Sequence, residues 1–241
     1  GNVIAQTAVA GRNTRGVAIT AAGHVWISSS VNGGNGYGWL KVEPDGGATL
    51  ASFQNDLGSY GIAIDPFGRI WSATSWLGGE SLQWIDADRG GVVQRWLLNQ
   101  YCGASCYFYG LTVDVNGDTW GTFWKDGWND SAQVYWMDGD YRCPNNQTTC
   151  TVSDGNGIRR RIDVRGVLNA AGASRIVGGR GVAVDANNFV WAVFNDEGTP
   201  GRPSYAVKID GETGEPILAT RTGRDSVGIT PDADGFIWVV N

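Results

Sequence analysis

Two arginines and two tyrosines hold equivalent positions in the sequence, each directly before a glycine that opens a similar block. They are Arg15, Tyr60, Tyr109 and Arg180, and Val227 holds the fifth such position. Guanidinium groups and phenol rings together offer charge, hydrogen bonds and stacking surfaces to a ligand. If the blocks surround one axis, these side chains should meet in a single binding site.

Aromatic and acidic residues follow the same blocks and form a second group of candidates. The members of this group are Trp76, Trp124, Asp126, Trp128 and Asp196. Exposed aromatic rings beside carboxylates suit stacking on sugar rings or contact with a partner protein. The alternative is that these rings only cover the protein core. Asp126 and Asp196 could also converge as the acid and base of a glycoside hydrolase.

The five blocks share one pattern, in which a tryptophan follows the opening glycine by ten positions. The blocks are GVAITAAGHVW (16–26), GIAIDPFGRIW (61–71), GLTVDVNGDTW (110–120), GVAVDANNFVW (181–191) and GITPDADGFIW (228–238). Apolar residues alternate with others on both sides of a polar turn, which predicts a β-hairpin. The seventh position after the opening glycine holds Gly in four blocks and Asn188 in the other, as expected where the backbone needs a positive φ.

Further apolar segments follow the hairpins and complete a repeated unit of four antiparallel strands. Where no insertion interrupts it, the unit is 45 to 49 residues long, the size of a propeller blade. The sequence therefore predicts an all-β protein, a β-propeller in a single domain over residues 1–241. We expect five blades, with residues 2–9 supplying a strand that closes the last blade, and six or seven if the chain is a fragment. A surface insertion is expected around residues 139–178.

The five Gly-to-Trp blocks resemble the repeats of NHL-type and virginiamycin B lyase-like propellers, over nearly the whole chain outside the insertion. Such repeats occur in lyases, hydrolases, binding modules and scaffolds, so the resemblance implies a fold and no single activity. Streptogramin lyases of this kind use a histidine base and a metal-binding glutamate on one face of the ring. The only histidine here, His24, lies in a hairpin expected on the opposite face, so no catalytic residue is carried over.

Charge and composition exclude several classes of partner. The 24 acidic and 18 basic residues give a net charge of −6, which disfavours nucleic acid and anionic membranes. The sequence contains no apolar run long enough to span a bilayer. Acidic residues near the turns could suggest calcium, but the segments are shorter than a calcium-binding loop. We expect these residues, Asp65, Asp114, Asp185 and Asp232, to organise the turns, and we expect no cofactor.

The cysteines form two close pairs, Cys102 with Cys106 and Cys143 with Cys150. This spacing suits two local disulfides in an oxidising compartment. Zinc is the alternative, but the pairs have neither a nearby histidine nor the usual ligand spacing. We therefore expect the protein outside the cell, on the cell surface or in the periplasm. Because the chain begins at Gly1 without Met, we also expect a processed or excised segment.

The preferred functional hypothesis is an extracellular module that binds a glycan or a partner protein. In propellers, ligands usually enter at the face that carries the connections between blades and those between the second and third strands. Both groups of candidate residues belong to these connections. One alternative is an extracellular lyase or glycoside hydrolase that uses carboxylates at the same channel mouth. Another is a structural scaffold domain of a larger surface protein or filament.

Overall fold

The chain forms antiparallel β-sheets and one short α-helix in the parts that the computed structural model describes. The described residues are 13–30, 38–43, 48–54, 59–74, 81–88, 91–98, 106–125, 132–198 and 200–241. Within these ranges, no helix has the length and apolar character needed to cross a membrane. The predicted all-β class is confirmed.

Along the chain the strands form four groups of four, numbered below as the first to fourth sheets, and a two-stranded hairpin comes last. The pairing of Trp124 with Gly178 joins the third and fourth groups into one nine-stranded sheet. The first sheet contains β1 (Asn13–Ile19), β2 (Val25–Ser30), β3 (Gly38–Val42) and β4 (Thr49–Gln54). The second contains β5 (Ser59–Ile64), β6 (Ile70–Thr74), β7 (Ser81–Ile85) and β8 (Val92–Leu97). The third contains β9 (Cys106–Val113), β10 (Thr119–Lys125), β11 (Gln133–Met137) and β14 (Gly157–Asp163). The fourth contains β15 (Ile176–Val184), β16 (Phe189–Asp196), β17 (Pro203–Asp210) and β18 (Pro216–Arg224). The hairpin contains β19 (Gly228–Pro231) and β20 (Ile237–Val240).

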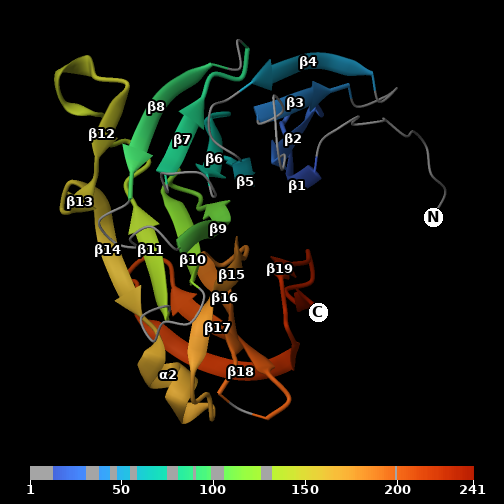
Figure 1. Cartoon of the computed structure of the whole chain (residues 1–241), viewed down its shortest axis with the longest axis vertical. Helices are drawn as coiled ribbons and strands as arrows, with labels where there is room; N and C mark the ends of the chain where they lie inside the picture. Colours follow the sequence, from blue (N-terminus) through green and yellow to red (C-terminus); the bar gives the residue numbers. More distant parts are fainter. Residues whose placement is uncertain are drawn as a thin grey trace.

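The sheets form an arc about a common centre, with the first strand of each sheet innermost (Figure 1). The innermost strands β1, β5, β9, β15 and β19 contact one another in that order. Separate apolar layers fill the space between neighbouring sheets. A small twisted sheet cannot bury both of its faces alone, so each packs against the next. This radial packing is the arrangement of blades in a propeller.

The repeated tryptophans occupy these layers in the first three sheets. Trp26, Trp71 and Trp120 are fully buried, and each belongs to a different apolar layer. Trp191 is partly buried against the layer between the fourth sheet and the β19–β20 hairpin. Trp238 does not fill such a layer among the described residues. Its side chain is 61% exposed, because no further described sheet packs against β20.

Each hairpin turns at the predicted position. The residues with positive φ there are Gly23, Gly68, Gly117, Asn188 and Gly235, with φ between 62° and 85°. Asparagine tolerates this conformation better than other residues with a side chain. The single exception to glycine in the pattern therefore keeps the same turn geometry.

The segment predicted as a surface insertion, residues 139–178, contains the fourth strand of the third sheet. This strand, β14, pairs with β11 and carries the arginines at 159–161. Only the flanking pieces are additions to the four-stranded sheet. They are η2 (Pro144–Asn146), β12 (Thr149–Thr151), β13 (Ser153–Asp154) and α2 (Arg165–Ala170). Consecutive arginines are compatible with a strand here because all three residues are exposed and form ion pairs with acidic residues.

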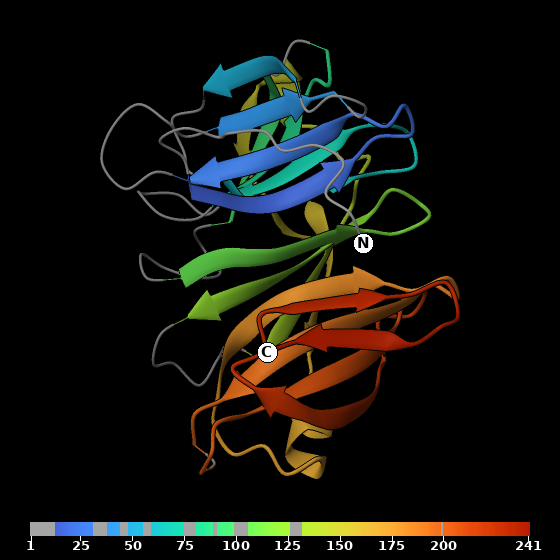
Figure 2. The ribbon, with the colours of Figure 1, turned by 90° about the vertical axis from the view of Figure 1, so that its right-hand side faces the viewer.

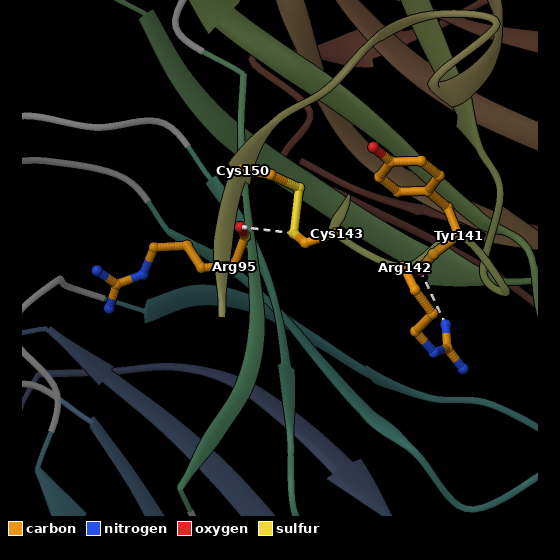
Figure 3. The surroundings of a disulfide bond; sticks show 5 residues. All are labelled: Arg95, Tyr141, Arg142, Cys143 and Cys150. Carbon is orange, nitrogen blue, oxygen red and sulfur yellow. Dashed lines mark hydrogen bonds between the residues drawn. A yellow bond between two sulfur atoms is a disulfide. The ribbon is translucent and has the colours of Figure 1, made fainter. Parts of the chain in front are cut away.

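Cys143 and Cys150 form a disulfide, as predicted. The Sγ atom of Cys143 lies 4.0 Å from the carbonyl oxygen of Arg95 on β8 (Figure 3). Beside it, β12 pairs in parallel with β8. The cross-linked segment therefore joins the second sheet, while β14 downstream belongs to the third. The predicted bond between Cys102 and Cys106 is not tested, because Cys102 lies outside the described residues.

The first sheet and the β19–β20 hairpin lie at the two ends of the arc of sheets (Figure 2). Apolar side chains are exposed on both of them. Val17 and Ile19 on β1 are 63% and 64% exposed, and Val240 on β20 is 56% exposed. Residues 2–9, the predicted closing strand, lie outside the described residues.

Candidate functional site

Each innermost strand of the four sheets carries a β-bulge at the residue predicted to line the site. The residues at these bulges are Arg15 and Gly16, Tyr60 and Gly61, Tyr109 alone, and Arg180 and Gly181. A bulge bends the strand and redirects a side chain, which is why bulges are frequent next to functional sites. The repeat therefore brings one polar or aromatic side chain from each sheet to the same end of the innermost strands.

The glycine after each of these residues allows neighbouring innermost strands to approach closely. A Cβ atom at Gly110 would lie 2.1 Å from the carbonyl oxygen of Arg180. At Gly16, a Cβ atom would lie 2.8 Å from the carbonyl oxygen of Tyr60. Both distances are too short for real atoms, so any larger residue would push the strands apart. The opening glycine thus sets the spacing of the site residues.

Hydroxyl groups on the second strands hold two of the site residues in place. Ser28 Oγ donates a 2.8 Å hydrogen bond to the carbonyl oxygen of Tyr60 and accepts one from the N–H of Gly16. Thr122 Oγ1 donates a 3.0 Å hydrogen bond to the carbonyl oxygen of Arg180. The sequence analysis missed both residues. The available signal was their shared position, two residues after the repeated tryptophan.

Five of the predicted ligand-binding residues form one group, which we call the Arg–Tyr cluster: Arg15, Tyr60, Tyr109, Trp124 and Arg180. The Tyr60 hydroxyl donates a 2.6 Å hydrogen bond to the Tyr109 hydroxyl, and their ring centres are 4.2 Å apart. The Arg15 guanidinium lies 5.0 Å from the centre of the Tyr60 ring. The Arg180 guanidinium lies 5.7 Å from the Tyr109 ring and 5.0 Å from Trp124. Two cations therefore flank a pair of phenols.

Burial favours the protonated form of the central phenol of the cluster. It raises the pKa of Tyr60 above its ordinary value of 10.0, and the hydrogen bond to Tyr109 raises this pKa further. Arg15 and Arg180 act in the opposite direction through their positive charge, but the balance remains upward. The cluster thus combines cationic guanidinium groups with neutral hydroxyls. Such a set of donors suits an anionic or polyhydroxylated ligand.

The other predicted site residues do not join this cluster in the described structure. Asp196 is fully buried, and its carboxylate accepts hydrogen bonds from the backbone N–H groups of Ser174, Arg175 and Gly198 at 2.8–2.9 Å. It therefore holds the segment before β15 against the end of β16. Trp76, Asp126 and Trp128 lie outside the described residues.

The aspartates near the turns organise the hairpins, as predicted. Asp114 Oδ1 accepts the N–H groups of Asn116 and Asp118, while Oδ2 accepts the indole N–H of Trp120 at 3.0 Å. Equivalent bonds to an indole are made by Asp65, Asp185 and Asp232. The link to the tryptophan was not predicted, although its signal is the fixed six-residue spacing. In the described part of the chain, no group of three or more His, Cys, Asp or Glu side chains is placed to hold a metal ion.

No family model matches the sequence, and no curated protein matches it. Solved structures do share its fold. Virginiamycin B lyase from Staphylococcus aureus aligns with a TM-score of 0.57 and 17% identity, over 94% of this chain and 62% of the lyase chain. The PQQ-bound aldose sugar dehydrogenase from Streptomyces coelicolor aligns with a TM-score of 0.56 and 14% identity, over 99% of this chain and 76% of that one. Glutaminyl cyclase from Myxococcus xanthus aligns with a TM-score of 0.52 and 16% identity, over 95% of this chain and 86% of that one.

These comparisons confirm the predicted resemblance at the level of the fold. The chain spans about 62% of the length of the virginiamycin B lyase structure. The matched proteins bear the names of three different enzymes, so the shared fold assigns none of their activities. The chain is similar to virginiamycin B lyase in architecture and has the β-propeller fold.

Proposed function

We propose that the protein is an extracellular binding module that holds an acidic glycan at the Arg–Tyr cluster. The observation that carries this proposal is the convergence of two guanidinium groups on a hydrogen-bonded pair of tyrosines. A guanidinium group pairs with a carboxylate or sulfate in a bidentate manner. Phenol and indole rings beside it can stack on the apolar face of a sugar.

The positive cluster stands on a protein with a net charge of −6. A local cationic site on an acidic surface selects for a small anionic group and against extended polyanions, which the rest of the surface repels. This contrast supports a glycan with isolated acidic groups. An acidic segment of a partner protein is the competing ligand.

The proposed extracellular or periplasmic location is supported by the bond between Cys143 and Cys150. Disulfides persist in oxidising compartments and are rare in the cytosol. Thiol titration of the protein recovered from its native compartment should therefore find both cysteines oxidised. Free thiols at these positions would contradict the proposed location.

Binding to a glycan array that includes uronate-containing and sulfated sugars tests the function. We expect saturable binding to acidic glycans, weakened about tenfold or more by Arg180→Ala and less by Arg180→Lys. Arg161→Ala is the matched control. Arg161 lies on β14, outside the Arg–Tyr cluster, and forms an exposed ion pair with Asp154 on β13. Equal binding by all variants would overturn the site. Binding only to acidic peptides would indicate a protein partner instead of a glycan. Turnover of a bound sugar would favour the enzyme alternative.

We also propose that the ring has five blades and that residues 2–9 complete the last one. Exposed Trp238 and Val240 on β20, and Val17 on β1, support a covering strand at this side of the molecule. Deletion of residues 2–9 should then lower the melting temperature by several degrees and promote association. An unchanged melting temperature would favour further blades from a longer chain.

A further inference from the structure

The tyrosine pair at the centre of the Arg–Tyr cluster connects two different sheets. Tyr60 belongs to β5 of the second sheet, and Tyr109 belongs to β9 of the third. Their hydroxyl oxygens are 2.6 Å apart and their ring centres are 4.2 Å apart, with an angle of 43° between the ring planes. The two phenols therefore contact each other through their oxygens and through their rings.

The backbone beside the pair holds the two rings at this distance. Ser28 Oγ donates a hydrogen bond to the carbonyl oxygen of Tyr60. A Cβ atom at Gly61 would lie 3.0 Å from the carbonyl oxygen of Tyr109 and 2.9 Å from the Cβ atom of Leu111. The innermost strands β5 and β9 are thus in close contact directly beside the pair. The packing of these strands, and not a bound ligand, brings the phenols together.

Side chains also pack against each ring from the outside. The Arg15 guanidinium lies 5.0 Å from the centre of the Tyr60 ring, and the Arg180 guanidinium lies 5.7 Å from the centre of the Tyr109 ring. Both tyrosines nevertheless remain partly exposed to solvent. A pair of rings that is held in contact and is still accessible is preorganised for a reaction between the rings.

Phenols react with one-electron oxidants. Loss of one electron and the hydroxyl proton gives a phenoxyl radical, whose unpaired electron is shared between the oxygen and the ring carbons ortho and para to it. Two such radicals combine through a bond between ortho carbons, and the hydrogens on these carbons then move to the oxygens. Radicals that are already neighbours need no diffusional encounter, which corresponds to a very high effective concentration.

We propose that Tyr60 and Tyr109 are a site of oxidative modification, at which two equivalents of a one-electron oxidant join the two rings by a carbon–carbon bond. Each equivalent takes up one electron, and the two phenolic protons pass to water. Peroxidases supply such oxidising equivalents from hydrogen peroxide, which is itself reduced to water. The product links the second and third sheets covalently at their innermost strands, between residues 49 positions apart. This inference depends on the geometry of the pair and not on the glycan function.

Oxidation of the purified protein at low concentration with two equivalents of hexachloroiridate(IV) tests the proposal, because this complex accepts an electron without transferring an atom. We expect the mass of the monomer to fall by two hydrogen atoms and the fluorescence of dityrosine to appear. Digestion should yield a cross-linked peptide that contains both Tyr60 and Tyr109. An unchanged mass, addition of oxygen alone, or cross-links only between separate molecules would overturn the proposal.

Three substitutions of tyrosine by phenylalanine locate the reaction. Tyr60→Phe and Tyr109→Phe each remove one phenol of the pair and should lower the yield of the intramolecular cross-link at least about tenfold. Tyr141→Phe is the matched control and should keep the yield, because Tyr141 is half-buried and its hydroxyl has no hydrogen bond among the described residues. All three variants keep the ring, so they should fold alike, which circular dichroism checks. Equal yields from Tyr60→Phe and Tyr141→Phe would contradict the assigned pair.

The cross-link should also stabilise the protein. After the same oxidation, the unsubstituted protein should melt several degrees above the Tyr60→Phe variant relative to their difference before oxidation, because a link between distant residues restricts the unfolded chain. An unchanged difference would overturn the stabilising role of the cross-link.

Discussion

The first hairpin and the other four follow one sequence pattern but differ in the hydrogen bonding of the repeated tryptophan's indole N–H. In four hairpins an aspartate accepts the indole N–H, as Asp114 does for Trp120. In the first hairpin Thr20 holds that position, and its hydroxyl accepts the backbone N–H of His24. Trp26 is fully buried, and its indole N–H has no acceptor among the described residues.

This difference shows what the aspartate contributes. A carboxylate has two oxygens and can accept hydrogen bonds from the turn and from the indole at once. A threonine hydroxyl has only one oxygen, which here accepts the turn N–H. An unsatisfied buried donor costs about 1–3 kcal/mol. The first hairpin should therefore be the weakest of the set. Arg15 of the Arg–Tyr cluster lies near the other end of β1. The lower stability of the first hairpin therefore concerns a strand that carries a cluster residue.

Asp114→Ala should have the largest effect, lowering the free energy of unfolding by about 3 kcal/mol. The variant removes the acceptor of two turn N–H groups and leaves the indole N–H of the buried Trp120 unsatisfied. Urea unfolding measures the change. The matched variant Thr20→Ala should cost less than about 1 kcal/mol, because Trp26 has no hydrogen bond to lose. Equal losses would contradict the distinction between the hairpins.

Replacing the tryptophans themselves sharpens the comparison. Trp120→Phe and Trp26→Phe remove the same atoms from fully buried positions. Trp120→Phe also breaks the hydrogen bond to Asp114, so it should cost about 1 kcal/mol more than Trp26→Phe. Chemical unfolding of the two variants gives the difference. A larger loss for Trp26→Phe would show that packing alone governs these positions.

Thr20→Asp should repair the first hairpin and raise the free energy of unfolding by about 1 kcal/mol. The new carboxylate would stand where the other hairpins place the acceptor of the indole N–H. A double-mutant cycle with Trp26→Phe tests the cause, because most of the gain should vanish when the indole is absent. The same gain in both backgrounds would assign it to the turn alone.

Much of the fold could be predicted because its determinants are local. The positive φ at Gly23 and Asn188 follows from residue type, and the alternation around the turn defines two strands. The pairing of β14 with β11 could not be predicted, because the arginine-rich sequence of β14 does not indicate its partner strand. Its position depends on β11, which precedes it by about twenty residues, and on the cross-linked segment between them.

In the candidate site, too, local sequence patterns predicted some features, and contacts between distant residues could not be predicted. Equivalent positions before the opening glycines predicted that Arg15, Tyr60, Tyr109 and Arg180 belong together, and the bulges bring them there. Asp196 is the last residue of β16, where a binding residue could stand, but its buried carboxylate accepts hydrogen bonds from three backbone N–H groups. Two of these donors come from residues 174 and 175, more than twenty positions away. Such partners leave no local pattern in the sequence.

The smallest expected effect concerns the pH dependence of the last hairpin. The hydrogen bond from the Trp238 indole lowers the pKa of Asp232 below its ordinary value of 3.8, and backbone N–H groups add to this. A lowered pKa in the folded state means that ionised Asp232 stabilises the hairpin above the ordinary pKa. This contribution is lost as the pH falls through the lowered value. Thr20 does not titrate in this range, so the first hairpin should lack this dependence.

NMR titration of the indole N–H signals between about pH 5 and pH 2 measures this effect. The Trp238 signal should shift with a midpoint below 3.8, as Asp232 becomes protonated and its bond to the indole weakens. Asp232→Asn should remove the step, because the amide does not ionise. The Trp26 signal serves as an internal control and should stay flat over the same range, since its hairpin has Thr20 in place of the aspartate. A Trp238 midpoint at or above 3.8 would mean that the indole bond does not favour the ionised carboxylate, and the contrast between the hairpins would then rest on turn geometry alone.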